Sequence, residues 1–389
     1  MALTGRPGGP SLGPPAGLVP KLRAVGARLG EAASALGVSL AVDPLALLVE
    51  RAAIAGLSRR GTTSCGGASR LLPCRDGWFV LSLARREDVA LVPAWLERSD
   101  VPANPWDLIS TMLATRPVDE LLGRARLLGL PAARLPSATG RAHGLPVATL
   151  ERAADPLTAL AGVRVVELAS LWAGPLCGSL LAAAGADVVK VESTGRPDGA
   201  RSGPTAFFDL LNGGKRSVAL DLTTAPGVDA LRALVATADV VIEASRPRAL
   251  EQLGIDATAL VAGDGPRAWL SITGHGRTGP PREWVAFGDD AAVAGGLVAW
   301  DGAGPVFCAD AIADPVTGVV AAVAVLEALA AGGHHLIDLS LATVAAHVAG
   351  PTRPVPSTVD AAQPVARQPP TSGPPLGHHT TEVLAALPR

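Results

Sequence analysis

The stretch that most constrains the fold is 161–192, which reads AGVRVVELASLWAGPLCGSLLAAAGADVVKVE. Residues 163–168 form a valine-rich run that is long enough for a buried parallel strand. A segment rich in Ala, Leu and Gly predicts a helix over 176–184, Gly185 ends it, and 188–191 starts a second strand. This is a βαβ unit, whose ligands bind beyond the strand ends, here at the turn 170–175. The turn has no GxGxxG fingerprint, so periodicity alone fits an ordinary sheet core equally well.

Strand and helix patterns alternate from 161 to 349, which predicts an α/β fold with a Rossmann-like, doubly wound parallel sheet. The predicted strands lie at 163–168, 188–191, 217–221, 240–243, 268–273, 304–309 and 334–341. The predicted helices lie at 176–184, 226–236, 249–253 and 315–331. The last of these helices is almost entirely apolar and begins next to Asp314.

The residues before 161 predict a second, smaller α+β domain over 20–135. Its predicted elements are helices within 20–60, a glycine-bearing loop at 61–69, a hairpin at 71–83, helices at 86–97, 105–115 and 118–128, and a short strand at 130–135. We expect 1–19 to be a flexible leader and 136–160 a linker. The Pro-rich end, 350–389, predicts an extended strap and a short helix capped by Thr380 or Thr381.

Composition argues against several classes of protein. The formal net charge of −2 gives no general attraction to nucleic acid or to an acidic membrane surface. No apolar run of about 20 residues is free of breaks, so we expect no membrane span. No secretory signal is visible at the N-terminus. The four cysteines have no CxxC spacing, which predicts reduced thiols in a cytosolic protein and no metal site.

Six phrases of the large domain together resemble the class III coenzyme A transferase family, which includes formyl-CoA and carnitine-CoA transferases and α-methylacyl-CoA racemases. They are LAGVRVVELASLWAGP, LLAAAGADVVKVE, NGGKRSVALDL, ADVVIEASRPRALEQLGI, SITGHGRTGPPREWVAFGDD and ADPVTGVVAAVAVLEAL. GTTSCGGASRLLPCRDGWFVLSLA is similar to the start of the family's small domain, and PPLGHHTTEVLAAL to its C-terminal phrase. The small domain here precedes the large one, which reverses the family's usual order.

The resemblance implies an acyl-CoA:carboxylate CoA-transferase that works through an aspartyl mixed anhydride and an enzyme–CoA thioester. The phrase A-D-x-x-T-G identifies Asp314 as the nucleophile, with Asp310 as the alternative. A helix N-terminus also favours negative charge, although Asp314 could equally serve as a helix cap. Gly66 and Gly67 match the mobile loop that closes over the aspartyl intermediates, and an ordinary turn fits the sequence as well.

The resemblance also places coenzyme A, or an acyl-CoA, as a substrate at the ends of the first strands, and implies no permanently bound cofactor. The implied CoA-binding residues are Leu171, Trp172, Ala173, Lys215, Leu220, Ala244, Ser245 and Arg246. The expected partners are an acyl-CoA, a carboxylic acid acceptor and a second copy of the chain in a homodimer. Related transferases carry an arginine where Ser193 stands, and Arg196 or Arg201 could replace it.

Two other functions remain open at this point. Racemases of the family pair an aspartate with a histidine in G-H-D, because exchange of an α-proton needs a base on each face. Here Phe287 takes the place of that histidine, which leaves Asp289 or Asp290 as a substitute base. The second alternative is a catalytically degenerate CoA-binding protein, since Trp172 and Ser193 alter the CoA phrases.

Overall fold

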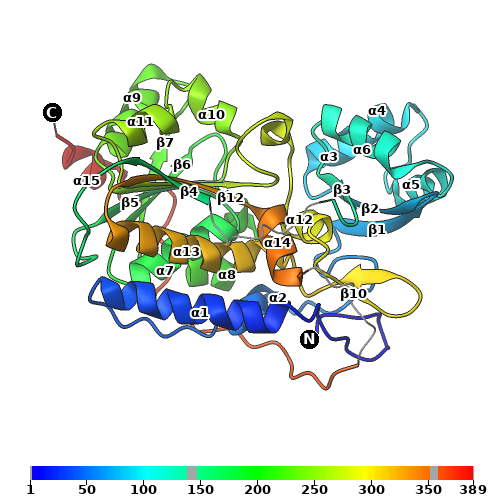
Figure 1. Cartoon of the computed structure of the whole chain (residues 1–389). Helices are drawn as coiled ribbons and strands as arrows, with labels where there is room; N and C mark the ends of the chain where they lie inside the picture. The colour runs from blue at the N-terminus through cyan, green and yellow to red at the C-terminus, as the bar shows by residue number, and fades with distance from the viewer. Residues whose placement is uncertain (1, 138–146, 351–357, 389) are drawn as a thin grey trace.

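The computed structural model describes residues 2–137, 147–350 and 358–388. Figure 1 shows a large unit built around a seven-stranded sheet, with a smaller unit of three strands and several helices beside it. The α/β fold predicted from the sequence is confirmed.

The large sheet has the strand order β4-β12-β9-β8-β5-β6-β7. Its strands are β4 (Val147–Arg152), β5 (Arg164–Leu168), β6 (Asp187–Ser193), β7 (Arg216–Leu220), β8 (Val240–Glu243), β9 (Ala268–Thr273) and β12 (His334–Ser340). All neighbours pair in parallel except β4, which runs antiparallel to β12 at the edge. The strand order reverses at β5, because β6 and β7 extend the sheet to one side and β8, β9 and β12 to the other. This is the doubly wound arrangement.

Two predictions about strands differ from the structure. The segment 304–309 contains β11 (Pro305–Phe307), which pairs antiparallel with β10 (Val298–Trp300) in a separate two-stranded ribbon rather than in the large sheet. Conversely, β4 lies inside the predicted linker, of which 138–146 fall outside the described residues. Its residues 148–150 are exposed, so this edge strand lacks the apolar alternation that would have revealed it.

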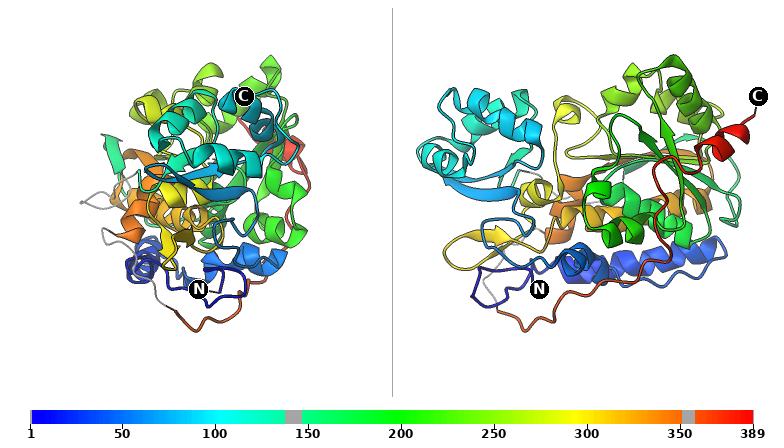
Figure 2. Two further views of the ribbon diagram at one scale, coloured as in Figure 1. Left: turned by 90° about the vertical axis from the view of Figure 1, so that its right-hand side faces the viewer. Right: turned by 180° about the vertical axis from the view of Figure 1, so that it is seen from behind.

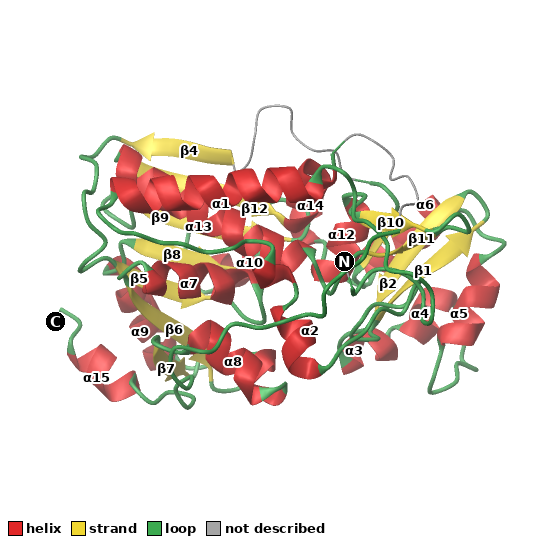
Figure 3. Ribbon diagram, turned by 90° about the horizontal axis from the view of Figure 1, so that it is seen from below, coloured by secondary structure: helices red, strands yellow, loops and turns green. Residues whose placement is uncertain are grey.

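Helices cover both faces of the large sheet (Figures 1 and 3). On one face, α9 (Ala225–Ala236), α10 (Pro247–Gln252) and α11 (Ala257–Ala262) share an apolar core with the strands. On the other face, α7 (Ala173–Ala183) packs against α13 (Ala313–Ala331), and α1 (Leu18–Ala35) lies along α13. Although α13 is long and apolar enough to cross a membrane, 83% of its most apolar window is buried inside the protein, as in the core helix of a soluble domain.

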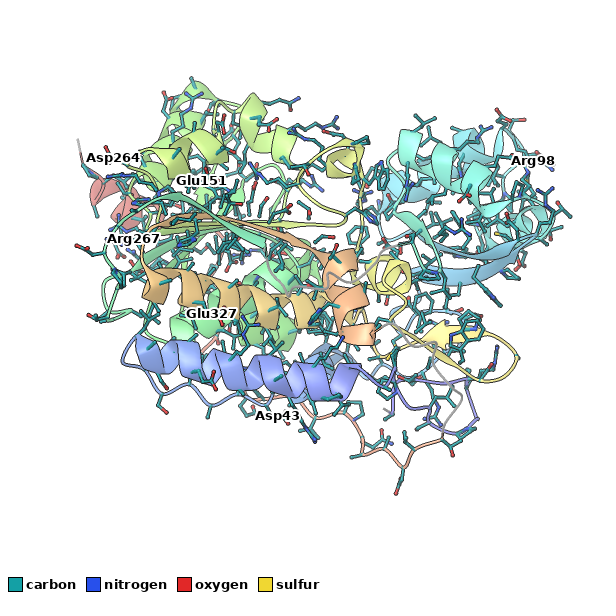
Figure 4. All side chains as sticks on the ribbon, viewed as in Figure 1. Asp43, Arg98, Glu151, Asp264, Arg267 and Glu327 are labelled. Carbon is teal, nitrogen blue, oxygen red and sulfur yellow. The ribbon has the colours of Figure 1, made fainter. Side chains whose placement is uncertain are left out.

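The helices of 20–60 belong to the core of the large unit, not to that of the small one as the sequence predicted. Leu18, Leu22 and Leu29 of α1 are buried against α13, as is Leu47 of the short 3₁₀ helix η1 (Ala46–Leu48). The physical reason is that α13 is apolar on every side and needs a cover, which its own half of the chain does not provide. Arg28 donates to both oxygens of Glu327 (3.0 and 2.8 Å), whose place on α13 is labelled in Figure 4.

The leader is also not the flexible segment that the sequence predicted. Its backbone folds around Arg59, whose guanidinium donates to the carbonyl oxygens of Ala2 (3.1 Å) and Gly9 (2.5 Å). Thr4 is buried, and its hydroxyl accepts a hydrogen bond from the backbone N–H of Ala309 (3.0 Å). A Pro- and Gly-rich segment can thus be ordered by one arginine that satisfies its carbonyl groups.

The small unit contains β1 (Ser69–Cys74), β2 (Gly77–Ser82) and β3 (Ala132–Arg134), with the predicted hairpin confirmed by the pairing of Cys74 with Gly77. One face of this sheet packs on α4 (Val92–Leu96), α5 (Trp106–Leu113) and α6 (Val118–Leu127), and α3 (Arg86–Ala90) contacts α4. The other face, with Leu71 and Val80, packs on α12 (Gly288–Ala294) and α14 (Leu341–Ala349) of the large unit. Because this second face of the small sheet packs on α12 and α14, the glycine loop lies next to the large unit.

The C-terminal strap runs along the underside of the large unit and up to the outer strand β7 (Figure 2, right). It is extended from 358 and ends in α15 (Thr380–Ala385), which follows His379 rather than being capped by Thr380 or Thr381. On the way it passes α2 (Glu50–Ala55) and α8 (Thr205–Asn212), where Arg367 pairs with Glu50 and the Gly373 N–H donates to Asp209 (2.8 Å). The remaining short helices are η2 (Gly199–Ser202) and η3 (Pro280–Glu283).

The close packing of α7 on α13 is testable at Gly318. A Cβ added there would lie 2.8 Å from the carbonyl oxygen of Ala173, which belongs to the backbone and cannot rotate away. We expect Gly318→Ala to destabilise the protein by about 1–3 kcal/mol in urea unfolding. Gly123→Ala on α6 is the matched control, because its Cβ would meet nothing within 4 Å. It should stabilise by about 0.5–1 kcal/mol. Equal effects of the two substitutions would contradict the packing.

Candidate active site

The first part of the site is the turn after β5. Leu171 adopts φ 70°, and its backbone N–H donates to Asp198 (2.9 Å). Trp172 is only 3% exposed, because its ring packs edge-on against Phe207 (5.3 Å between centroids) and lies under the guanidinium of Arg51. Ala173 is buried as well. Of these three predicted residues, the structure exposes only Leu171.

Two predicted CoA-binding residues, Lys215 and Leu220, have buried side chains. The Lys215 ammonium is buried and donates to Glu167 (2.7 Å), to the carbonyl of Pro175 (2.8 Å) and to Asn212 (3.2 Å). Its burial lowers the pKa to about 8, although Glu167 opposes the change. Leu220 is also buried. Lys215 therefore holds the sheet together internally and has no N–H left for a phosphate, which corrects its predicted role.

The segment after β8 is more open. Ala244 and Arg246 are exposed, and Ser245 is half-buried. In the part of the chain that the structure describes, Arg246 makes no ion pair. Burial lowers the pKa of its guanidinium below the ordinary value, and neighbouring positive charges lower it further, while the charge of Glu283 opposes them. The positive charges belong to Arg248, Arg85 and Arg196.

The four arginines come from separate parts of the chain. Arg196 follows β6, Arg246 and Arg248 lie at the start of α10, and Arg85 precedes α3 of the small unit. Arg201, the other substitute considered from the sequence, is instead paired with Glu192 (2.6 Å). Sequence reasoning missed Arg85, because nothing in the small domain's sequence indicates that α3 faces the large sheet. This cationic cluster lies beside the point where the strand order reverses, the usual ligand position in such sheets.

The second part of the site is the N-terminus of α13. Asp314 is half-buried in the first turn, and its backbone N–H donates to Ala311 (2.9 Å). Gly288 packs against it so closely that an added Cβ would lie 2.5 Å from the Asp314 carboxylate. Burial raises the pKa of Asp314 to about 7, Arg51 opposes this rise, and the charges of Asp289 and Asp310 add to it.

Three further aspartates lie around Asp314. Asp310 is buried and receives a bidentate pair from Arg51, Nε at 2.8 Å and Nη2 at 2.6 Å. Asp289 accepts from the Ser69 hydroxyl (3.1 Å) and from the backbone N–H of Ala311 (3.0 Å). Burial and the charge of Asp310 raise the pKa of Asp289 to about 6.

Asp290 is fully buried and is held by the small unit. Its Oδ1 accepts from the Ser82 hydroxyl (2.8 Å) and from the backbone N–H of Phe287 (3.0 Å). Burial raises its pKa to about 7. Ser69 and Ser82 lie on β1 and β2, so the aspartates of α12 join the two units. Within the described residues, no three Asp, Glu, His or Cys side chains are grouped as metal ligands.

The glycine loop comes to the same place. Gly66 is exposed, and a Cβ on it would lie 3.4 Å from Arg51 Nη2. Gly67 has φ 84° and donates its N–H to Ser64 (2.9 Å), a conformation that favours glycine. The neighbouring Cys65 thiol is buried, which raises its pKa well above the ordinary value and makes it an unsuitable nucleophile.

Arg51 is a second residue of the site that sequence reasoning missed. It lies on α2, between Asp310 and the Trp172 ring (5.5 Å from guanidinium carbon to ring centroid). The only signal in the sequence was the pair Glu50-Arg51 within an otherwise apolar helical stretch. That pair did not reveal which element α2 would approach.

Phe287 and His275 bear on the racemase alternative. Phe287 lies under the Arg85 guanidinium (5.5 Å) and offers no base. His275 packs edge-on against Trp284 (5.5 Å between centroids). Burial and the charge of Arg126 lower its pKa to about 4, so it is neutral at physiological pH. No observation here favours a two-base proton exchange.

Comparison with known proteins gives a consistent result. The family described as CoA-transferase family III matches residues 160–381. The succinate–glutarate CoA-transferase of Agrobacterium fabrum is 36% identical over 205 residues, which cover 48% of this chain and 51% of that protein. The formyl-CoA:oxalate CoA-transferase of Escherichia coli is 31% identical over 183 residues, 44% of each chain. The chain thus spans about half the length of the curated relatives that it matches.

Among solved structures, a CAIB/BAIF family protein from Brucella suis is 36% identical. The match covers 48% of this chain and 54% of that one, with a TM-score of 0.45.

The buried carboxyl of Asp290 gives a pH prediction. Folding raises its pKa from the ordinary 3.8 to about 7, so its contribution to stability is greatest at low pH and is lost as pH rises through 7. Between about pH 5.5 and pH 8.5 this group should cost the folded state about 2 kcal/mol. Asp290→Asn keeps the Oδ1 acceptor without the titration.

Urea unfolding at the two pH values tests this expectation. Asp290→Asn should lose about 2 kcal/mol less than the wild-type protein over this interval. Asp264→Asn, at a side chain that is 96% exposed, should behave as the wild type. An unchanged slope in Asp290→Asn would show that Asp290 does not titrate in this range.

Proposed function

Because the chain belongs to CoA-transferase family III, we propose that it is an enzyme that transfers coenzyme A from an acyl-CoA to a second carboxylic acid. The observation that carries this proposal is the place of Asp314. It lies half-buried at the N-terminus of an apolar helix, with a pKa raised to about 7, near Arg51, against which the exposed Gly66 packs. A carboxylate so placed is ionised in part at neutral pH and is a better nucleophile than one in water.

In the proposed reaction, an Asp314 oxygen attacks the thioester carbonyl and the CoA thiolate leaves, which gives a mixed anhydride. The thiolate then attacks the Asp314 carbonyl and releases the first acid as its carboxylate, leaving an Asp314–CoA thioester. The second acid's carboxylate attacks that thioester and expels the thiolate again. Attack of the thiolate on the new acyl carbonyl yields the product acyl-CoA and restores the Asp314 carboxylate.

The backbone around Asp314 supports these steps. Each attack places negative charge on a carbonyl oxygen, and backbone N–H groups close to that oxygen stabilise it. Gly288, packed on the carboxylate, and Gly66, beside Arg51, allow such close approach because they have no side chain. We assign Gly66 and Gly67 to a loop that closes over the intermediates.

Coenzyme A carries a 3′-phosphate and a diphosphate, which need cationic partners. We assign Arg246 and Arg196 to these phosphates, since both follow strands at the reversal point of the sheet. Arg85 adds positive charge nearby, although its own guanidinium is paired with the buried Asp88. The backbone of the Leu171 turn and the segment of Ala244 and Ser245 would line the path of the pantetheine toward Asp314. We assign Lys215 no contact with CoA, because its ammonium already has three acceptors inside the protein.

Relatives of this chain are named for succinate, glutarate and oxalate, so short dicarboxylic acids are the first acceptors to test. We also propose a homodimer and a cytosolic location, with no permanently bound cofactor. Light scattering of the purified chain tests whether it is a homodimer.

Asp314→Asn tests the nucleophile. After incubation with an acyl-CoA such as succinyl-CoA, hydroxylamine should convert Asp314 of the wild-type protein to its hydroxamate, seen as a mass shift in the peptide that contains it. Asp314→Asn should give no hydroxamate and lower turnover by a factor of at least about 10³. Asp264→Asn, far out on the surface, should react as the wild type.

The same incubation separates the alternatives. A hydroxamate that persists in Asp314→Asn assigns the nucleophile elsewhere, with Asp310 first in line. Deuterium uptake at the α-carbon without exchange of CoA indicates a racemase. Binding of CoA with neither reaction leaves a binding protein.

Arg246→Ala tests the phosphate site. We expect the Kd for CoA to rise roughly 10- to 100-fold, because one charge-assisted contact to a phosphate is lost. Arg98→Ala is the control, since Arg98 is an exposed arginine of the small unit paired with Asp100. Isothermal titration with CoA and with 3′-dephospho-CoA shows which phosphate is involved. Unchanged affinity for both ligands would remove Arg246 from the site.

A further inference from the structure

The Arg51 guanidinium is held by two partners. Its Nε and Nη2 donate to Asp310, and it lies over the Trp172 ring. The helix that carries it is short, but the preceding residue, Glu50, is buried and bound by Arg367 of the strap (2.5 and 3.1 Å). A guanidinium fixed in this way loses little further conformational entropy when it binds a ligand.

The fixed guanidinium still has donors to offer. An arginine has five N–H groups, and Asp310 uses one on Nε and one on Nη2. Among the described residues, Nη1 donates to none. The side chain is 31% exposed, and the exposed Gly66 lies beside Nη2. The free N–H groups therefore lie within reach of a ligand that approaches the exposed part of Arg51 beside the glycine loop.

The charges around Asp314 require a cation for any acid substrate. Asp289, Asp310 and Asp314 are grouped there, and a dicarboxylic acid would add two negative charges. Among the residues that the structure describes, Arg51 is the cation whose charge lowers the pKa of Asp314 most. A carboxylate that enters this space without contacting Arg51 would meet mainly negative charge.

The chemistry decides which carboxylate suits Arg51. The reacting carboxylate must give up its charge as it attacks, so a strong bond to an arginine in the ground state would slow it. A second carboxylate on the same acid keeps its charge throughout the reaction, and binding it costs no reactivity. We propose that Arg51 binds this second, unreacting carboxylate and so selects dicarboxylic acids over monocarboxylic ones; the inference rests on the proposed function.

The test compares acids of equal chain length, glutarate and valerate, as acceptors with succinyl-CoA as donor. The wild-type protein should prefer glutarate. Arg51→Gln should reduce the preference on the order of 30-fold, mainly through KM for glutarate, since one charge-assisted pair is lost. Arg51→Lys should retain part of the preference. Arg28→Gln removes another ion-paired arginine next to α13 and should leave the preference unchanged.

Arg51→Gln leaves Asp310 buried without its partner, so this variant can fail to fold. The double variant Arg51→Gln/Asp310→Asn removes both charges and should show the same lost preference in a folded protein, as judged by its unfolding midpoint and its affinity for CoA.

The outcomes separate the two proposals. If the wild-type protein forms no Asp314 hydroxamate with succinyl-CoA, the proposed function fails. If the hydroxamate forms but glutarate and valerate are used equally well, the selection of dicarboxylic acids is overturned. If the wild type prefers glutarate, and Arg51→Gln and Arg51→Gln/Asp310→Asn both keep that preference, the role of Arg51 is overturned.

Discussion

Helix α13 is buried along nearly its whole length, and its burial determines where charge can lie in this protein. The helix packs between the large sheet and α1, with α7 and α14 at its sides. Desolvation of a charge within such a helix would cost several kcal/mol, so polar groups are confined to its ends. The N-terminal end meets α12, and there Asp289, Asp310 and Asp314 gather, at the end of a helix that favours negative charge. The position of the site therefore follows from the packing of an apolar element.

The same constraint explains why distant parts of the chain meet at the site. The exposed side of α13 needs a cover, and α1 supplies it, which brings α2 and Arg51 to Asp310 and Trp172. The strap then fastens α2 through Arg367 and Glu50, and the leader packs its Thr4 against Ala309. Segments from both ends of the chain thus support a helix terminus near residue 314. Arg51 compensates negative charge that would otherwise destabilise the aspartates in their ionised form.

Beneath the turn of Leu171 lies a second buried assembly of charges. Glu167, Lys190, Lys215 and Asp198 alternate in sign, and Asp198 also receives the Leu171 N–H. Removing any one of them would leave a buried charge unpaired, so the assembly is strongly coupled. It fixes the strained φ of Leu171 and thereby the path of the backbone at the reversal point of the sheet. The lysines that stand out in the sequence therefore act in the interior and not on a ligand.

The sequence by itself determined the alternation of strands and helices, the hairpin of the small unit, the apolar helix and the phrases that name the family. These are local features, fixed by the spacing of apolar residues and by turn chemistry over a few positions. It could not determine that 20–60 cover α13, that Lys215 is internal, or that Arg51 and Arg85 face the site. Each of those depends on which apolar surfaces meet across more than a hundred residues of chain. Periodicity shows that a face will be buried, but only tertiary packing decides against what, and the partner of a charged side chain follows from that choice.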